Sequence, residues 1–361
     1  MQETPKGKQK KIAIVMGCHR SGTSLIAAAL KHFGAYLGKN LRSASEENEK
    51  GFFENVHIVD FNDRLLEFLN GRWDNPFFDG QQALSIIDEE TLGPWQDEAE
   101  ALFRDTFGDE DFCAIKDPRM CQLLPFWQRV LKKCDYHDEM IYYVHIARHP
   151  VEVAHSQRKR KQTNPVFYAM GDTTLETVAL WFSLSIQALR DINSDNNCFF
   201  IYDDFLKYPR DQLGRFLDYL EIEKEQDRIT TFVEEYIDKT LRHHEVASRD
   251  LQLLETYFPA SIQLYKAQQA LAGKKAFTRT DTYNFVDLWN KPEVNRDFNE
   301  AAYPFVSRVT HERHRSFLST EILAKAEERL RRENDQMKER LTELDRQASH
   351  LSSKYLSLIH I

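Results

Sequence analysis

The stretch from residue 11 to residue 34 constrains the fold more than any other part of the sequence. "KIAIVMG" (Lys11–Gly17) is a continuous apolar run, typical of a strand buried on both faces. "TSLIAAALKHFG" (Thr23–Gly34) is an apolar helix pattern that ends on a glycine. The loop "GCHRSGTS" (Gly17–Ser24) joins the two. A strand, a glycine-containing loop and a helix together place backbone N–H groups and the positive end of a helix around an anion.

Further apolar runs extend this unit into a larger sheet. They predict strands over "FCAIK" (Phe112–Lys116), "IYYVHIAR" (Ile141–Arg148) and "CFFIY" (Cys198–Tyr202). Helical patterns lie between and after them, over Gln122–Cys134, Val151–Arg160, Leu175–Ile192 and Asp211–Leu220. Strands that alternate with helices favour an α/β fold: a P-loop-like parallel sheet covered by helices on both faces. Such sheets bind ligands at the carboxyl ends of their strands.

Charge and cysteine content narrow the class of protein. The 361 residues carry a formal net charge of −9, which argues against a general binder of nucleic acid or anionic membranes. An anionic ligand must then be held by a local cluster of basic side chains. The five cysteines show no paired spacing, which favours a reduced, cytoplasmic compartment. The N-terminal apolar run is too short for a signal peptide or a membrane span, so no transmembrane segment is expected.

The sequence predicts further parts after a main domain at residues 10–245. Residues 246–315 form a helical and irregular extension with aromatic-rich polar stretches. Residues 316–355 predict a coiled coil and hence a possible homodimer, the alternative being one long helix packed on the main domain. Its seam repeats every seven residues at Leu323, Leu330, Met337, Leu344 and Leu351. Residues 356–361, "LSLIHI", match a translated transposon end used in sequencing libraries, so they are expected to be an artefact, with the protein continuing past Tyr355.

The loop differs from the loop of nucleotide hydrolases at one decisive position. That loop reads G-x-x-x-x-G-K-[ST], and its Lys neutralises the β- and γ-phosphates. Gly17, Gly22 and Ser24 keep the pattern, but Thr23 replaces the Lys and a basic residue, Arg20, stands inside the loop. This arrangement suits a ligand with a single 5′-phosphate that carries a reactive group. Another mononucleotide, or plain turn chemistry, is an open alternative for the loop alone.

The loop resembles the 5′-phosphosulfate-binding loop of sulfotransferases that use 3′-phosphoadenylyl sulfate (PAPS), especially the R-S-G-T-[ST] form of tyrosylprotein and many bacterial enzymes. Those enzymes carry an Arg at a later strand end and a Ser eight residues on, and both bind the 3′-phosphate. "ARHPVEVAHSQRKR" places Arg148 and Ser156 at that spacing, and Arg160 matches a further basic position. Lys116, in "IKDPR", occupies the family's K-D-P lysine, and Tyr202 resembles an aromatic near the nucleotide. Each feature has a purely structural alternative. The segment from Arg148 to Arg160 could be a solvated basic helix, Lys116 could lie in an exposed turn, and Tyr202 could be a buried strand tyrosine.

This resemblance implies a sulfotransferase that moves a sulfuryl group from PAPS, without a metal, to a hydroxyl acceptor such as a glycan. Arg20 and Lys116 are the expected electrostatic groups. Glu54, in "KGFFEN", is the expected general base, with Glu46 and Glu47 as competitors. The implied cofactor-binding residues are Arg20, Ser21, Gly22, Thr23, Ser24, Arg148, Ser156, Arg160 and Tyr202. An inactive nucleotide-binding scaffold that oligomerises through its coiled coil is the alternative, and a degenerate P-loop kinase or NTPase fits least well.

Overall fold

The computed structural model describes residues 10–44, 51–108, 110–163, 172–237 and 248–304. Its contacts divide the chain into two compact units, Met1–Phe305 and Val306–Ile361. The coiled-coil heptads and the suspected artefact at residues 356–361 fall outside the described residues. The coiled coil, the homodimer and the domain boundary after residue 245 therefore stay predictions.

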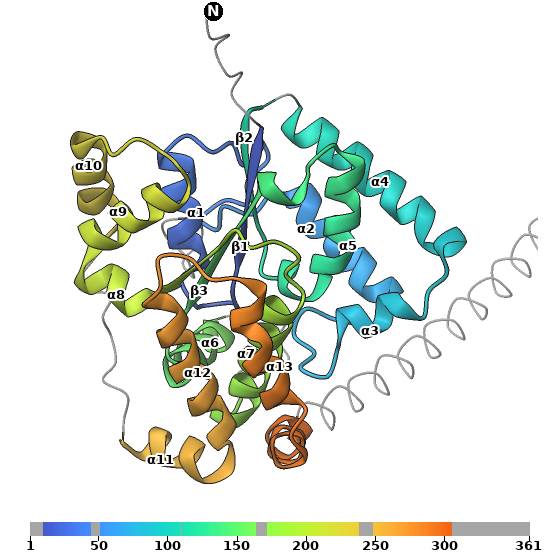
Figure 1. The fold of residues 1–361 in the computed structure, drawn as a ribbon. Helices are drawn as coiled ribbons and strands as arrows, with labels where there is room; N and C mark the ends of the chain where they lie inside the picture. The colour runs from blue at the N-terminus through green and yellow to red at the C-terminus, as the bar shows by residue number, and fades with distance from the viewer. Residues whose placement is uncertain (1–9, 45–50, 109, 164–171, 238–247, 305–361) are drawn as a thin grey trace, which may run out of the picture. The chain divides into compact units, whose positions relative to one another are not determined.

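A four-stranded parallel sheet forms the centre of the first unit (Figure 1). Its strands are β1 (Lys11–Met16), β2 (Phe112–Lys116), β3 (Ile141–Ala147) and β4 (Asn197–Ile201). The spatial order is β2-β1-β3-β4, and every neighbouring pair is parallel. The predicted parallel α/β fold is confirmed, and each strand lies within one residue of its predicted bounds.

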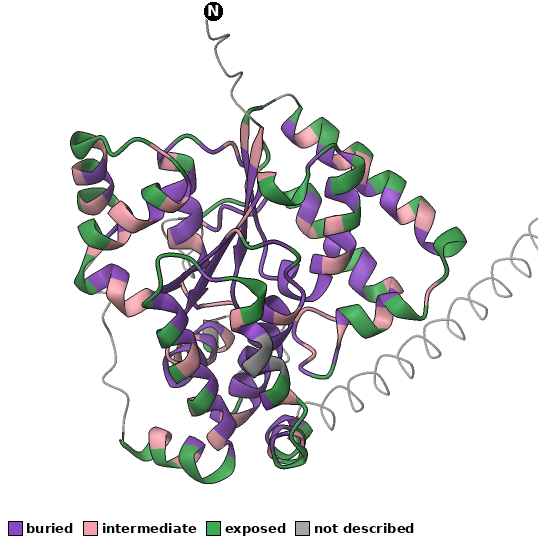
Figure 2. Ribbon diagram, in the orientation of Figure 1, coloured by how far each residue is buried: buried purple, intermediate pink, exposed green. Residues whose placement is uncertain are grey.

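The strands are apolar because helices cover both faces of the sheet. Every residue of β4 is buried, as is every residue of β1 after Lys11. In Figure 1, α1, α9 and α10 lie on one side of the strands, and α2, α4 and α5 lie on the other. Figure 2 shows the consequence: the strands are buried, while the helices are exposed on their outer sides.

The helices of the described residues range from short single-turn segments to the long α4. Their bounds are α1 Thr23–His32, α2 Val56–Phe68, α3 Gly80–Ser85, α4 Glu89–Phe107, α5 Met120–Lys133, α6 Pro150–Thr163, α7 Thr174–Arg190, α8 Tyr202–Lys207, α9 Pro209–Tyr219, α10 Gln226–Tyr236, α11 Ser248–Tyr257, α12 Pro259–Ala272 and α13 Tyr283–Trp289, with 3-10 turns at Asp138–Met140 and Arg279–Thr282. Residues 292–304 are also helical.

Parallel strands bring their carboxyl ends to one edge of the sheet. Gly17 follows β1, Lys116 ends β2, Arg148 follows β3 and Tyr202 follows β4. The chain leaves β1 toward β2 on one side and later returns to add β3 on the other, so the β1–β3 border is a topological switch point. In open α/β sheets, ligands bind at such a border. The fold therefore gathers residues from four separate strand ends at one place.

Candidate functional site

The loop after β1 is shaped by glycines that no other residue could replace without strain. Gly22 caps α1 with a left-handed φ of 100°. A Cβ atom there would lie 2.5 Å from Cδ2 of Tyr202. A Cβ atom at Gly17 would lie 2.5 Å from the carbonyl oxygen of Ile146 on β3. Close packing against β3 and Tyr202 thus fixes the path of the loop and points the N-terminus of α1 toward the carboxyl edge.

Two segments far apart in the sequence meet at this loop. Arg20, whose φ of 66° is also left-handed, donates a hydrogen bond from Nε to Oγ of Ser156, 2.9 Å away and 136 residues later. Ser156 lies on α6, the helix that follows Arg148. The residues expected at the 5′- and 3′-ends of a nucleotide are therefore in direct contact.

Arg148 lies between an acidic and an aromatic side chain. Its Nε donates to Glu152 Oε2 at 3.0 Å, one turn later on α6. Its guanidinium carbon lies 4.9 Å from the ring centroid of Tyr202. Burial raises the pKa of Tyr202, and the positive charge of Arg148 partly opposes that rise, so the phenol stays neutral at physiological pH. Because Tyr202 also packs against Gly22, it links Arg148 to the loop.

The expected catalytic pair is in contact and buried. Nζ of Lys116 lies 2.5 Å from Oε1 of Glu54, with side-chain exposures of 3% and 6%. Glu54 directly precedes Asn55, whose side chain caps α2 by accepting from the backbone N–H of His57 and Ile58. This cap fixes the backbone next to Glu54. The competing candidates Glu46 and Glu47 lie outside the described residues.

Arg42 is a member of this cluster that the sequence did not reveal. Its Nη1 lies 3.6 Å from Oε2 of Glu54, and its backbone N–H donates to the carbonyl oxygen of Glu54. Two cations, Lys116 and Arg42, thus hold the two oxygens of one carboxylate. Arg42 could not be predicted from a sequence spacing. Backbone hydrogen bonds between residues 40–42 and 54–56 bring it next to Glu54.

The turn after Lys116 is held by a buried polar network. Asp117 accepts from Arg119 Nη1 at 3.0 Å and from Asn62 Nδ2 at 2.9 Å. Arg119 also makes a two-pronged ion pair with Asp63. Such paired hydrogen bonds hold the two side chains in one orientation and also stabilise their opposite charges. They set the direction in which the chain leaves β2, and therefore the position of Lys116.

The remaining predicted residues surround the same loop. Ser21 and Thr23 are buried, and Oγ of Ser24 lies 3.5 Å from the carbonyl oxygen of Phe52, next to the Glu54 segment. Arg160 is buried on α6, one turn beyond Ser156. His19, inside the loop, has a pKa lowered well below its usual range by burial and by the positive charges of Arg119, Arg160, Lys116 and Arg20. The loop is therefore the centre of a cationic cluster within an acidic chain.

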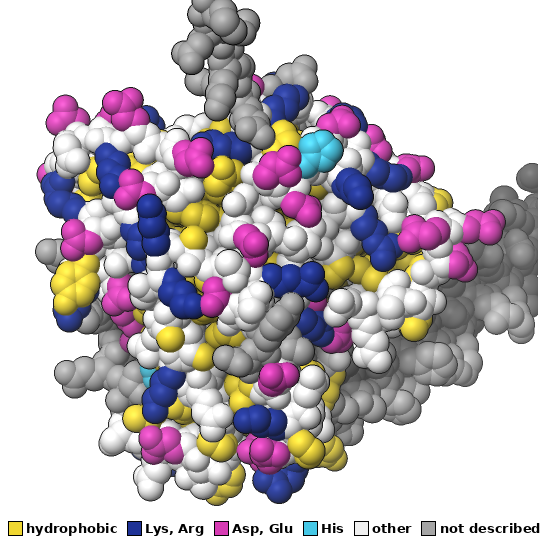
Figure 3. Space-filling model, in the orientation of Figure 1, with side chains coloured by type: hydrophobic (Ala, Val, Ile, Leu, Met, Phe, Trp, Pro, Cys, Tyr) yellow, Lys and Arg dark blue, Asp and Glu magenta, His cyan; other side chains and the backbone are white. Residues whose placement is uncertain are grey.

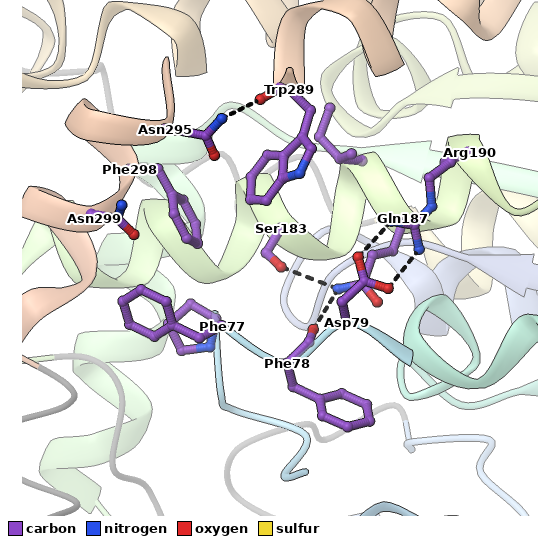
Figure 4. Close-up of a pocket in the computed structure, with 12 residues that line it drawn as sticks. Phe77, Phe78, Asp79, Ser183, Gln187, Arg190, Trp289, Asn295, Phe298 and Asn299 are labelled. Atoms are coloured by element: carbon purple, nitrogen blue, oxygen red, sulfur yellow. Dashed lines mark hydrogen bonds and ion pairs between the residues drawn. The ribbon is translucent and has the colours of Figure 1, made fainter. Parts of the chain in front are cut away.

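A separate cavity of about 130 Å³ lies between α7, the loop before α3, and the helical residues near 289–299 (Figure 4). Phe77, Trp289 and Phe298 give it aromatic walls, and Asn295 and Asn299 add amides. It shares no residue with the loop cluster. The two are connected along the chain, because Trp73, four residues before Phe77, contacts the ring of His19.

Among the described residues, no helix is both long and apolar enough to span a membrane, and no group of three or more His, Cys, Asp or Glu side chains could hold a metal. On the face seen in Figure 3, basic and acidic side chains are interspersed.

No protein-family model matches the chain, and no curated protein matches it. Among solved structures, the chain is similar to the sulfotransferase domain of the Synechococcus PCC 7002 olefin synthase, with 18% identity, 71% of this chain and 98% of that one covered, and a TM-score of 0.37. It is similar to the sulfotransferase domain of the curacin biosynthetic pathway, with 15% identity, coverage of 69% and 98%, and a TM-score of 0.38. It is also similar to retinol dehydratase in complex with androsterone and PAP, with 15% identity, coverage of 82% and 80%, and a TM-score of 0.35. Two of these structures are sulfotransferase domains and the third is bound to PAP, and all three likenesses are distant.

Proposed function

We propose that this chain is a sulfotransferase that transfers the sulfuryl group of PAPS to a hydroxyl acceptor. The observation that carries the proposal is the hydrogen bond between Arg20 Nε and Ser156 Oγ. It joins the loop suited to a 5′-phosphosulfate to the helix that follows Arg148, the residue suited to a 3′-phosphate. A nucleotide with phosphates at both its 5′ and 3′ positions would contact both segments at once.

The donor would be held by charge and by backbone N–H groups. The N-terminus of α1, with Ser21, Gly22, Thr23 and Ser24, would bind the 5′-phosphate. Arg148, Ser156 and Arg160 would bind the 3′-phosphate. The bond from Arg148 to Glu152 uses Nε, which leaves both Nη groups without a partner among the described residues and able to donate to a phosphate.

The reaction would be an in-line displacement at sulfur. A bond forms from the acceptor oxygen to sulfur, and the bond from sulfur to the bridging phosphate oxygen breaks, its electron pair going to the phosphate. Glu54 would take the proton of the acceptor hydroxyl. Arg20 and Lys116 would stabilise the charge that develops on the bridging and sulfuryl oxygens. The contact of Lys116 with Glu54 places the expected base next to the expected electrophilic group.

We further propose that the acceptor is a glycan. The support is the resemblance of the loop to those of sulfotransferases. The cavity in Figure 4, where Phe77 and Trp289 lie near the amides of Asn295 and Asn299, is a separate site that a more distant part of a glycan chain would contact. Aromatic faces suit the apolar face of a sugar ring, and amides suit its hydroxyls. A cytoplasmic location is likewise a proposal, supported by the five cysteines, all of them buried free thiols.

The direct test is transfer of radiolabelled sulfate from PAPS to a panel of hydroxyl-bearing glycans. Wild type is expected to label at least one glycan. Lys116→Ala is expected to abolish labelling while keeping measurable affinity for PAP, the desulfated product. Glu54→Gln should reduce turnover by about 10²–10⁴-fold, the range for general-base catalysis. PAP binding without transfer to any glycan would favour the scaffold, and full activity in Glu54→Gln would assign the base elsewhere.

A further inference from the structure

His19 is a buried polar side chain in the donor loop that the proposed mechanism does not use. Its ring meets the ring of Trp73 edge-on, with centroids 4.6 Å apart and an interplanar angle of 61°. Its Nε2 atom is buried and has no hydrogen-bond partner among the residues that the structure describes. Buried polar atoms in native proteins almost always have a partner, so an unpaired nitrogen in a binding loop needs an explanation.

The surroundings of His19 indicate the charge of the missing partner. Arg20 is the next residue, and Arg119, Arg160 and Lys116 are close enough for their positive charges to act on the imidazole ring. Burial first, and then these positive charges, lower the pKa of His19 well below its usual range, so the imidazole is neutral. A neutral ring can carry its one proton on Nε2 and donate it. Lys116 and Arg119 are paired with carboxylates, whereas Arg20 contacts the neutral hydroxyl of Ser156. A hydrogen-bond acceptor that enters beside Arg20 and His19 is therefore favoured when it carries negative charge.

We infer that His19 binds the donor directly, with Nε2 donating a hydrogen bond to an oxygen of the 5′-phosphate. This inference rests on the proposed function and adds a residue to its donor site. The 5′-phosphate is the expected partner because His19 lies next to Arg20, in the loop that would bind that phosphate. Trp73 would hold the ring in place through its edge contact.

The test compares two nucleotides and two variants. PAP carries both the 5′- and the 3′-phosphate, whereas 3′-AMP lacks the 5′-phosphate. His19→Phe keeps an aromatic ring against Trp73 and removes the nitrogen. His19→Gln is the matched control, because its amide nitrogen can reach the position of Nε2. Calorimetry on the full chain gives the affinity of each protein for each nucleotide.

His19→Phe is expected to bind PAP roughly ten- to a hundred-fold more weakly, the effect of one hydrogen bond to a charged group, and to bind 3′-AMP unchanged. His19→Gln should regain most of the PAP affinity. If wild type prefers PAP over 3′-AMP and His19→Phe keeps the full preference, the inference is overturned while the donor site stands. A wild type that shows no preference for PAP would overturn both the inference and the donor site.

Discussion

Arg148 illustrates how one residue can carry the specificity for a nucleotide. It follows β3, stacks near the ring of Tyr202 and is paired with Glu152 through Nε. If it binds the 3′-phosphate, its loss must affect only nucleotides that carry that group. The role of the residue can therefore be separated from general effects on folding.

We predict that Arg148→Ala weakens PAP binding by about 1.5–3 kcal/mol, the range for hydrogen bonds to charged groups. Binding of 5′-AMP, which has no 3′-phosphate, should change little. Calorimetry with both nucleotides checks this. Equal losses for the two nucleotides would mean that Arg148 supports the site as a whole and does not read the 3′-phosphate.

A second residue, His145, makes the stability depend on pH. It is buried on β3, its ring stacks on Phe199 at 5.6 Å, and burial lowers its pKa to about 3. The folded state thus binds fewer protons than the unfolded state between that value and the ordinary pKa of about 6.5. The free energy of unfolding must fall as the pH falls through this window.

We predict that His145 costs the protein about 2 kcal/mol of stability between pH 8 and pH 5. His145→Gln cannot titrate, so its unfolding free energy should fall less over the same interval. Urea unfolding at the two pH values measures the difference. The same pH dependence in both proteins would rule out this contribution from His145.

The element that the account depends on most is the start of α1. Its cap, Gly22, has a left-handed backbone and leaves no space for a side chain beside Tyr202. A glycine in the middle of a regular helix has the opposite effect on stability, because replacing it with alanine removes backbone freedom from the unfolded chain without adding strain. Gly214, in α9, has only the flexible end of Lys224, 4.0 Å from the position that a Cβ atom would take, so a methyl group fits there without a clash.

We predict that Gly22→Ala destabilises the protein by about 1–2 kcal/mol or more, because it adds backbone strain and a clash with the Tyr202 ring. It should also weaken PAP binding by displacing the loop. Gly214→Ala is the control and should stabilise the protein by roughly 0.5–1 kcal/mol. Urea unfolding of both variants decides the point. A neutral Gly22→Ala would show that the loop is less constrained than its geometry indicates.

At the scale of the whole molecule, the sheet could be predicted from the sequence because each strand is marked by a short run of neighbouring apolar residues. A strand that helices cover on both faces needs apolar side chains on both faces, and a continuous apolar run supplies them. The helices α6, α7 and α9 likewise followed from their own patterns. Residues 277–304 did not, because distant contacts define their packing: Trp289 and Phe298 pack against Phe182 of α7.

The site divides in the same way. The positions of Lys116, Arg148 and Tyr202 at or next to strand ends could be predicted, because apolar runs mark the strands. Their roles rest on the family resemblance and stay predictions. The pairing of Arg42 with Glu54 and the contact of Trp73 with His19 could not, since both depend on where connecting segments cross. No regular spacing encodes such crossings.

The predicted coiled coil concerns assembly of the full chain. If the heptads at residues 323–351 form a two-stranded coil, replacing Leu330 and Leu344 with Glu should place charges in its seam and convert a dimer into a monomer. Sedimentation of wild type and of this double variant measures the change. Replacing Gln336 and Ser353, which lie outside the seam, with Glu is the matched control and should preserve the dimer. A monomeric wild type would contradict the prediction.

The central claim is that the loop "GCHRSGTS" serves a donor with a 5′-phosphosulfate and a 3′-phosphate, and not a nucleoside polyphosphate. The most direct measurement is the affinity of the wild-type chain for PAP and for ADP under the same conditions. Thr23 stands where a P-loop lysine would bind a β-phosphate, and the proposed function has Arg148 bind a 3′-phosphate. We therefore predict that PAP binds much more tightly than ADP. Equal affinities would contradict the account.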